Sequence, residues 1–231
     1  MATYNGEKYI KEQLESILHQ LSPFDEVIVS DDHSTDKTIE IIKTFNDSRI
    51  ITIENPGKGI IQNFENALKI STGEYIFLAD QDDVWNSNKI RTCVQDFENG
   101  YDLVLSDCSM FVSETNFEYQ DSYYAFIGSK MGIVNNIIKN SYIGCCMAFT
   151  SKVKNKVLPF PKNIPMHDSW IGIIGEMYFK VNFNRCKLIR YRKHAENASS
   201  TSSGKSSASL LKKINIRYLL AYNLLKKAII G

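Results

Sequence analysis

Short apolar runs and segments of helical periodicity alternate along the first third of the chain. The runs at 26–30 and 75–79 predict buried strands, because strands covered on both faces have continuous apolar sequence, and the run at 49–53 predicts another strand. Apolar residues recur three or four positions apart at 10–21 and 60–70, which is typical of amphipathic helices. Strands and helices that alternate through short connections predict an α/β fold, a Rossmann-like and mostly parallel sheet with helices on both faces.

The rest of the chain has less regular patterns. Residues 114–128 lack a clear period, so we expect either a loop over a site or a plain surface connection. Residues 198–209 contain seven serines and predict a flexible linker, and 210–231 has the pattern of an amphipathic helix. Further strands are predicted at 103–105, 110–112, 143–149 and 183–192, and further helices at 90–97, 129–139 and 168–178.

Composition narrows the classes of protein that fit. The chain has 231 residues, 43% of them hydrophobic, which is enough for one α/β domain with a core. The net charge of +1 gives no reason to expect nucleic-acid binding. The five cysteines lack metal-ligand spacing and are odd in number, so we expect a reducing, cytoplasmic location. No apolar run reaches the roughly 18 residues of a membrane span, and no signal peptide is apparent.

Three carboxylates, those of Asp80, Asp82 and Asp83, directly follow the apolar run at 75–79. In open α/β sheets ligands bind just beyond the carboxyl ends of the strands, so these acids lie where a ligand is expected. Like charges this close repel one another, and a divalent cation that prefers oxygen ligands, Mg²⁺ or Mn²⁺, would hold them together. The alternative is an acidic turn exposed to solvent, since Asp favours turns.

Three separated motifs occur in order along the chain. They are Met-Ala-Thr-Tyr-Asn-Gly at 1–6, Val-Ser-Asp-Asp-His-Ser-Thr-Asp at 29–36 and Ala-Asp-Gln-Asp-Asp-Val-Trp at 79–85. Together they resemble family 2 glycosyltransferases, and most closely the bacterial rhamnosyltransferase-like branch. The resemblance covers about 1–197 and implies a GT-A-type glycosyltransferase domain, with a nucleotide-binding half at about 1–84 and an acceptor half at 85–197.

The activity that this resemblance implies is inverting and metal-dependent. The enzyme would move a sugar, with rhamnose as one candidate, from a UDP- or dTDP-sugar donor to an acceptor. The acceptor would be a saccharide or a lipid-linked molecule in the synthesis of a bacterial cell-surface polysaccharide, and the cofactor would be Mg²⁺ or Mn²⁺.

The start of the chain departs from the family pattern. Family members begin with a full apolar strand before the Met-Ala-Thr-Tyr-Asn motif, whereas here Met1 is the methionine of the motif itself. We therefore expect a truncated first strand. Unless another segment fills that place, the neighbouring strands keep unpaired backbone groups.

The resemblance places the nucleotide near the first two strands. Tyr4 would stack on the base, and Asp31 would accept a hydrogen bond from the imide N–H that uracil and thymine share. Thr3 and Asn5 would support this pocket, and Asp80 would contact the ribose, or the metal through a water molecule. Without the resemblance, Asp31 is an ordinary turn acid in front of a helix.

The resemblance makes Asp82 the direct metal ligand and Asp80 a second candidate ligand. His194 would help to hold the metal or the diphosphate, and Arg192 would bind diphosphate oxygens. Arg190, Arg192 and His194 alternate along a predicted strand, so we expect them to share one face. The alternative for these basic residues is a solvated strand edge.

Asp168 matches the family's general base, which takes the proton of the acceptor hydroxyl. It also precedes the predicted helix at 168–178 and fits an N-cap, and the two roles are compatible. His167 replaces a glutamate that most of the family has, and its role stays open. Trp170 and residues 114–128 are candidates for shaping the acceptor site.

The C-terminal helix combines apolar residues with Lys212, Lys213, Arg217, Lys226 and Lys227. It would lie either on an anionic membrane surface or against the domain or a partner. The first option adds a peripheral contact with the inner face of the cell membrane to the expected cytoplasmic location. For the chain as a whole, the alternative to an enzyme is a catalytically silent domain that binds nucleotide sugars.

Overall fold

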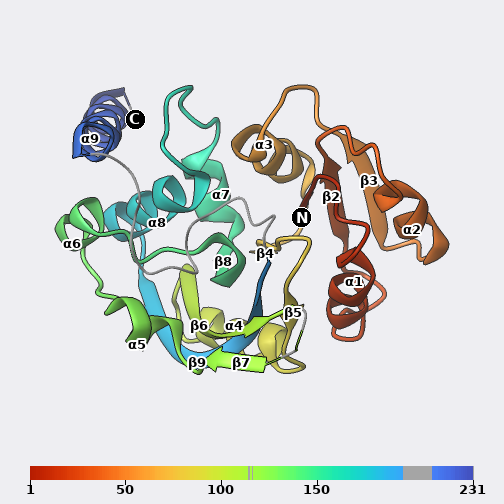
Figure 1. Cartoon of the computed structure of the whole chain (residues 1–231). Helices are drawn as coiled ribbons and strands as arrows, with labels where there is room; N and C mark the ends of the chain where they lie inside the picture. The colour runs from red at the N-terminus through yellow and green to blue at the C-terminus, as the bar shows by residue number, and fades with distance from the viewer. Residues whose placement is uncertain (114, 116, 195–209, 231) are drawn as a thin grey trace.

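Two β-sheets form the centre of the molecule, and helices pack around them (Figure 1). The computed structural model describes residues 1–113, 115, 117–194 and 210–230, so the predicted linker at 198–209 lies outside the described residues. The predicted α/β class is confirmed. Among the helices of the described ranges, none combines the length and the hydropathy that crossing a membrane requires.

The first sheet is parallel, with the strand order β1-β2-β3. Its strands are β1 (Ala2–Thr3), β2 (Val27–Asp31) and β3 (Ile50–Glu54), and the helices along this part of the chain are α1 (Ile10–Leu18), α2 (Thr38–Thr44) and α3 (Ile60–Ile70). The strands predicted at 26–30 and 49–53 and the helices predicted at 10–21 and 60–70 are present in this part of the chain. Because parallel strands end at one edge of a sheet, the segments that follow β1 and β2 lie together there.

The second sheet is mixed rather than parallel. Its order is β4-β8-β6-β9-β5, with β7 paired to β6. Strands β6 and β9 run parallel, whereas β4 pairs antiparallel with β8 and places Ile76 opposite Phe149. The strands are β4 (Tyr75–Phe77), β5 (Val84–Trp85), β6 (Leu103–Val112), β7 (Phe117–Gln120), β8 (Met147–Thr150) and β9 (Val181–Lys193).

Residues 103–128 differ most from the expected elements. The two short strands predicted at 103–105 and 110–112 are one strand, β6, and the segment 114–128 contains strand β7 and a helix instead of a plain loop. The remaining helices are α4 (Lys89–Glu98), α5 (Tyr123–Ile127), α6 (Ile133–Ile138), α7 (Ser151–Val157), α8 (His167–Tyr178) and α9 (Leu210–Ile230), with a 3₁₀ turn at Gly144–Cys146.

Trp170 belongs to the core and not to an acceptor site. Its side chain on α8 is fully buried, and its indole N–H donates to the backbone carbonyl of Val157 over 3.0 Å. The prediction that Trp170 shapes the acceptor site is therefore wrong. A buried indole needs an acceptor for its N–H, and the C-terminal end of α7 supplies it.

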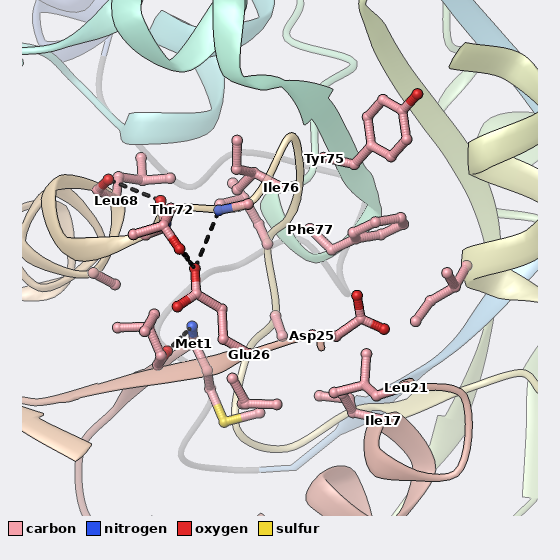
Figure 2. Close-up of a pocket in the computed structure, with 18 of the residues that line it drawn as sticks. Met1, Ile17, Leu21, Asp25, Glu26, Leu68, Thr72, Tyr75, Ile76 and Phe77 are labelled. Atoms are coloured by element: carbon pink, nitrogen blue, oxygen red, sulfur yellow. Dashed lines mark hydrogen bonds between the residues drawn. The ribbon is translucent and has the colours of Figure 1, made fainter. Parts of the chain in front are cut away.

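A groove of about 340 Å³ separates β2 from β4 (Figure 2). Met1 lies at its edge, where the α-amino group donates to the carbonyl of Ile28 over 2.7 Å and burial lowers the pKa of that group to about 5. Strand β1 has two residues, and no other described segment lies in the groove between β2 and β4. Apolar side chains in the lining include Ile17, Leu21, Leu68, Ile76, Phe77 and Trp85.

An extended apolar segment is expected to stabilise the protein by filling this groove. Five apolar residues added before Met1 would continue β1 along β2 and cover the side chains that face β4. We expect Tm to rise by about 5 °C or more relative to a Gly-Ser extension of equal length. Equal Tm values for the two extended proteins, measured by circular dichroism, would contradict the strand-like character of the groove.

Candidate active site

The segments that follow β1 and β4 are joined by a pair of hydrogen bonds. The backbone N–H of Tyr4 donates to Oε1 of Gln81 over 2.8 Å, and Nε2 of Gln81 donates to the carbonyl of Tyr4 over 2.9 Å. On the other side, Nε2 of Gln13 on α1 donates to the carbonyl of Asp80 over 2.8 Å. These bonds place the acids after β4 beside the predicted nucleotide pocket. No sequence pattern pointed to Gln81, because its contact spans 77 positions.

The structure brings together the side chains predicted to bind the nucleotide base. Asp31 is buried, and its carboxylate accepts hydrogen bonds from the hydroxyl groups of Thr3 (2.7 Å) and Ser34 (2.6 Å) and from the N–H of Ser34 (2.8 Å). Asn5 has a positive φ of 47°, and its N–H donates to the hydroxyl of Ser34 over 2.8 Å. The ring of Tyr4 is 56% exposed, as stacking on a base requires.

Negative charge accumulates in the loop after β4. Burial, followed by the charges of Asp82 and Asp168, raises the pKa of Asp80 to about 7. Asp83 is fully buried and accepts the N–H of Arg192 over 2.9 Å, and burial together with the charges of Asp82 and Asp80 raises its pKa well above its usual range. A cation bound next to such carboxylates would lower their pKa values, because its charge offsets their mutual repulsion.

The oxygen ligands of the loop fit Mg²⁺ or Mn²⁺. Among the described residues, potential ligand atoms of Asp80, Asp83 and Cys145 lie within 4.8 Å of one another. A hydrogen bond with Cys146, and then burial, raise the pKa of the Cys145 thiol well above its usual range, so the thiol keeps its proton. A hard cation would therefore use the carboxylate oxygens.

The predicted ligands are arranged differently from expectation. Asp82 and His194 are in direct contact, with 2.8 Å between Oδ2 and Nε2, and both side chains are largely buried. The group within 4.8 Å contains Asp80 but has Asp83 and Cys145 in place of Asp82 and His194. The predicted ligand roles of Asp82 and His194 stay predictions.

Arg192 connects the end of β9 to the acidic loop. Its Nε donates to the carbonyl of Asp82 over 2.7 Å, and its guanidinium pairs with the carboxylate of Glu12 on α1. The guanidinium also lies over the rings of Tyr9 and Phe111, at 5.0 and 4.6 Å. Because Arg192 is only 6% exposed, the alternative of a solvated basic edge is wrong for this residue.

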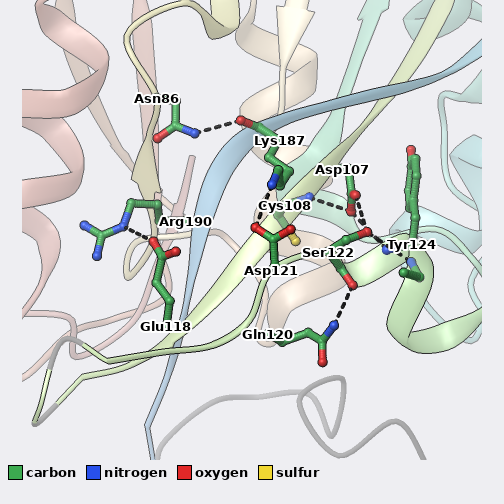
Figure 3. Close-up of polar contacts among 11 residues, drawn as sticks. Asn86, Asp107, Cys108, Glu118, Gln120, Asp121, Ser122, Tyr124, Lys187 and Arg190 are labelled. Carbon is green, nitrogen blue, oxygen red and sulfur yellow. Dashed lines mark hydrogen bonds and ion pairs between the residues drawn. The ribbon is translucent and has the colours of Figure 1, made fainter.

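Arg190 lies on the same face of β9 as Arg192, as the alternation along the strand predicts. Its guanidinium is 4.4 Å from the ring centre of Phe111, the ring that Arg192 also covers. Nε of Arg190 donates to Glu118 on β7 over 3.2 Å (Figure 3). The same figure shows Lys187 paired with Asp121 at 2.6 Å. These pairs join β7, and the residue that follows it, to β9 at the side of the candidate site.

Asp168 lies in the first turn of α8. The helix begins at His167 and Met166 occupies the N-cap position, so the N-cap interpretation of Asp168 is wrong. Its Oδ1 accepts the N–H of Ser169 over 2.5 Å and the hydroxyl of Ser169 over 3.2 Å. Burial raises the pKa of Asp168 to about 6 despite these bonds. Because its charge contributes to the raised pKa of Asp80, the two carboxylates interact across the site.

His167 is buried next to Asp168. Its ring stacks on Phe64 with 4.1 Å between ring centres, and neither ring nitrogen has a hydrogen-bond partner among the described residues. Burial lowers its pKa to about 3, so the imidazole is neutral at physiological pH. A carbon at the Cβ position of Gly144 would approach Nε2 to 2.8 Å, so the ring fills the space beside that glycine.

Comparison with known proteins identifies the family. The sequence model of the family described as "Glycosyl transferase family 2" matches residues 1–158, more than half of the chain. The chain belongs to glycosyltransferase family 2. This glycosyltransferase is similar to WfaP of Escherichia coli, described as a UDP-Glc:alpha-D-GlcNAc-diphosphoundecaprenol beta-1,3-glucosyltransferase. The two are 31% identical over 203 residues, which is 87% of this chain and 78% of WfaP.

A second relative supports the predicted branch. The dTDP-rhamnosyl transferase RfbG of Shigella flexneri is 38% identical over 102 residues, which is 41% of this chain and 35% of RfbG. The predicted resemblance to family 2, with a rhamnosyltransferase among its relatives, is confirmed.

Solved structures agree on the fold. TarS 1–349 of S. aureus, in complex with UDP-GlcNAc, matches with a TM-score of 0.71 at 20% identity, over 97% of this chain and 65% of that chain. The mannosyltransferase PcManGT of Pyrobaculum calidifontis, in complex with GDP-Man and Mn²⁺, matches with a TM-score of 0.60 at 18% identity, over 100% of this chain and 74% of that chain. The predicted GT-A-type fold is confirmed.

Proposed function

We propose that this family 2 glycosyltransferase is inverting and metal-dependent. Its donor is a UDP- or dTDP-sugar, with rhamnose as one candidate sugar, and its acceptor is a saccharide or a lipid-linked molecule of a bacterial surface polysaccharide. The names of WfaP and RfbG, which contain UDP-Glc, dTDP-rhamnosyl and a diphosphoundecaprenol acceptor, support this donor and acceptor class.

One observation carries the proposal, the meeting of charged groups from three separate elements. Asp80 and Asp82 follow β4, Asp168 lies in the first turn of α8, and His194 follows β9. Asp82 contacts His194, and the charge of Asp168 raises the pKa of Asp80. Carboxylates and an imidazole in this arrangement can hold a cation and a diphosphate while leaving one carboxylate for an acceptor hydroxyl.

The acidic loop after β4 would bind the metal ion. The carboxylates of Asp80 and Asp82, with His194 beside them, would hold Mg²⁺ or Mn²⁺, and the oxygens of buried Asp83 lie close by. When bound, such a cation stabilises the charge that develops on the leaving diphosphate. Arg192 and His194 would contact diphosphate oxygens, and the bonds from Arg192 to Glu12 and Asp82 keep that guanidinium in place.

Other residues near this loop would bind the nucleotide and the acceptor. The exposed ring of Tyr4 would stack on the base, and Asp31 would accept a hydrogen bond from the imide N–H of the base. Thr3 and Asn5 would support the pocket. Asp168 would take the proton of the acceptor hydroxyl as its oxygen attacks the anomeric carbon. The bond from that carbon to the diphosphate breaks, the nucleoside diphosphate leaves, and the configuration inverts.

The cellular setting completes the proposal. Nucleotide-sugar donors and the expected reducing environment favour a cytoplasmic location, and a lipid-linked acceptor would place the reaction at the inner face of the cell membrane. We propose that the protein meets such acceptors through a peripheral contact with that surface.

Donor screening tests the proposed function most directly. We expect UDP- or dTDP-sugars with Mn²⁺ to raise Tm by several degrees, because ligand that binds the native state stabilises it by mass action. A GDP-sugar should have a smaller effect, because guanine presents a different edge to Asp31. The same sugars with EDTA are the control. A shift with GDP-sugars alone would contradict the role of Asp31, and no Mn²⁺-dependent shift with any donor would contradict the proposal.

The second candidate is a catalytically silent domain that binds nucleotide sugars. The groove between β2 and β4 favours it, because an incompletely paired sheet next to the nucleotide pocket weakens the support of Asp31. Such a domain would show the donor-dependent Tm shift without release of nucleoside diphosphate. Turnover with any acceptor would exclude it.

A further inference from the structure

Helix α9 is apolar on two opposite faces, one buried and one exposed. One face packs on the domain, where Leu220 and Leu224 are buried in the same apolar cluster as Trp170. The opposite face carries large apolar side chains at intervals of three or four residues, which places them in one stripe. These are Leu211 (80% exposed), Ile214 (52%), Tyr218 (64%), Tyr222 (53%) and Leu225 (65%).

Helix α6 extends the exposed apolar surface. Arg217 of α9 donates from Nε to the carbonyl of Ile137 (3.2 Å) and from Nη2 to the carbonyl of Ile138 (2.6 Å), which fixes the two helices together. Met131, Val134 and Ile138, in and just before α6, are 49%, 70% and 61% exposed. Figure 1 places α6 and α9 at the end of the molecule away from α2 and β3. We call these three residues and the five of the α9 stripe the α6–α9 face.

The charged residues in the two sequence segments that contain the α6–α9 face have one sign. The sequence has neither Asp nor Glu at 128–147 or at 210–230. The same two segments carry Lys130, Lys139, Lys212, Lys213, Arg217, Lys226 and Lys227. Glu176 of α8 is the acid that contacts α6, and its carboxylate is turned to the N–H of Gly132, over 3.0 Å, and to Asn136. Apolar side chains edged by cations match the surface of an anionic bilayer.

We infer that the α6–α9 face docks on an anionic lipid bilayer, with α9 lying in the plane of the interface. The ring centres of Tyr218 and Tyr222 are 6.3 Å apart, and tyrosines of this kind sit at the level of the lipid headgroups. The neighbouring aliphatic side chains of the stripe enter the acyl boundary, and Lys226 and Lys227 contact lipid phosphates. This inference deepens the proposed function, on which it rests for the purpose of the contact, by naming the surface that brings the enzyme to a lipid-linked acceptor.

Vesicle sedimentation of the full chain tests the inference. The wild type should sediment with vesicles of equal parts phosphatidylglycerol and phosphatidylcholine and stay in solution with phosphatidylcholine alone. The double variant Tyr218→Ser/Tyr222→Ser should lower the partition coefficient at least tenfold, because it removes apolar area from the interface. Lys226→Gln/Lys227→Gln should lower it by about twentyfold, since each cation near an anionic surface contributes several-fold.

A matched control removes exposed aromatic rings elsewhere. Phe24→Ser/Phe117→Ser deletes two rings that are 97% and 65% exposed and lie outside the α6–α9 face, so vesicle binding should not change. Equal binding of the wild type and the tyrosine variant, or equal binding to neutral vesicles, would overturn the inference. A dimer in solution that the tyrosine variant breaks would also overturn it, since the face would then be a protein interface.

The Mn²⁺-dependent Tm shift with donor separates this inference from the proposed function. All these variants should keep that shift, which also shows that they are folded. If the wild type shows the donor-dependent Tm shift but does not bind vesicles, the proposed docking surface is wrong and the proposed function is unaffected. Vesicle binding without any donor shift supports the docking surface and overturns the proposed function.

Discussion

Asp82→Asn is expected to abolish the metal-dependent binding of a nucleoside diphosphate and to lower kcat/KM by about a thousandfold. The substitution keeps the size of the side chain and a partner for Nε2 of His194, which lies 2.8 Å from Oδ2. It removes one negative charge from a loop in which Asp80 and Asp83 already have raised pKa values. Calorimetric titration with UDP in the presence of Mn²⁺, together with initial rates, measures both effects.

Stability separates a lost site from a lost fold in this variant. The charge of Asp82 raises the pKa values of Asp80 and Asp83, so its removal relieves repulsion and Tm should stay equal or rise. Asp121→Asn is the matched control, because that acid pairs with Lys187 at the surface and has an 81% exposed side chain. Full Mn²⁺-dependent UDP binding by Asp82→Asn would show that the cation is held by Asp80 and Asp83 without Asp82.

The parallel first sheet follows from local sequence alone. The apolar runs at 26–30 and 49–53 and the helical periods at 10–21 and 60–70 correspond to β2, β3, α1 and α3. Each of these patterns lies within one element, and short connections between strand and helix leave few possible topologies.

The second sheet depends on contacts that no local pattern contains. The apolar run at 75–79 predicts a buried strand in a parallel sheet. The strand β4 pairs antiparallel with β8 instead, and β8 lies about 70 residues further along the chain, beyond the reach of a local pattern. The polar and aromatic residues at 114–128 have no period of their own. Strand β7 forms there because β6 offers an edge to pair with and Arg190 offers a partner for Glu118.

The candidate site also combines features that the local sequence predicts with contacts that it does not. The acids after β4 could be placed from the sequence, since ligands bind beyond the carboxyl ends of strands. The contact between Asp82 and His194 spans 112 positions, and that between Arg192 and Glu12 spans 180. The resemblance supplied the first pair and gave nothing for Glu12, which is an ordinary helix acid in the sequence. The burial of Arg192 could not be predicted from the sequence either, because its neighbours Tyr9 and Phe111 come from the start of α1 and from β6.

Asp168→Asn is expected to lower kcat by about a thousandfold while leaving Mn²⁺-dependent donor binding unchanged. Asn cannot accept the acceptor's proton, whereas the groups that hold the nucleotide and the cation keep their places. Removal of a half-buried charge whose pKa is raised by burial should also keep Tm at pH 7.5 equal or raise it. Initial rates at saturating donor, with calorimetric Kd values for UDP, measure the separation. Ser169→Ala, which removes one hydrogen bond to Asp168 and keeps the carboxylate, should cost less than tenfold.

The pH profile distinguishes a general base from a residue that merely positions the acceptor. Asp168 accepts a proton only when it is ionised, and its pKa of about 6 lies above the usual value because the side chain is buried. For the wild type, kcat/KM should therefore fall tenfold per pH unit below about pH 6 and level off above it. Burial raises the pKa of Asp80 to about 7, and a bound cation would lower it. At saturating Mn²⁺ the titration of Asp80 should therefore appear in the Kd for Mn²⁺ rather than in kcat/KM. Residual turnover of Asp168→Asn that keeps the acid limb near pH 6 would assign that limb to another group and remove Asp168 from the base role.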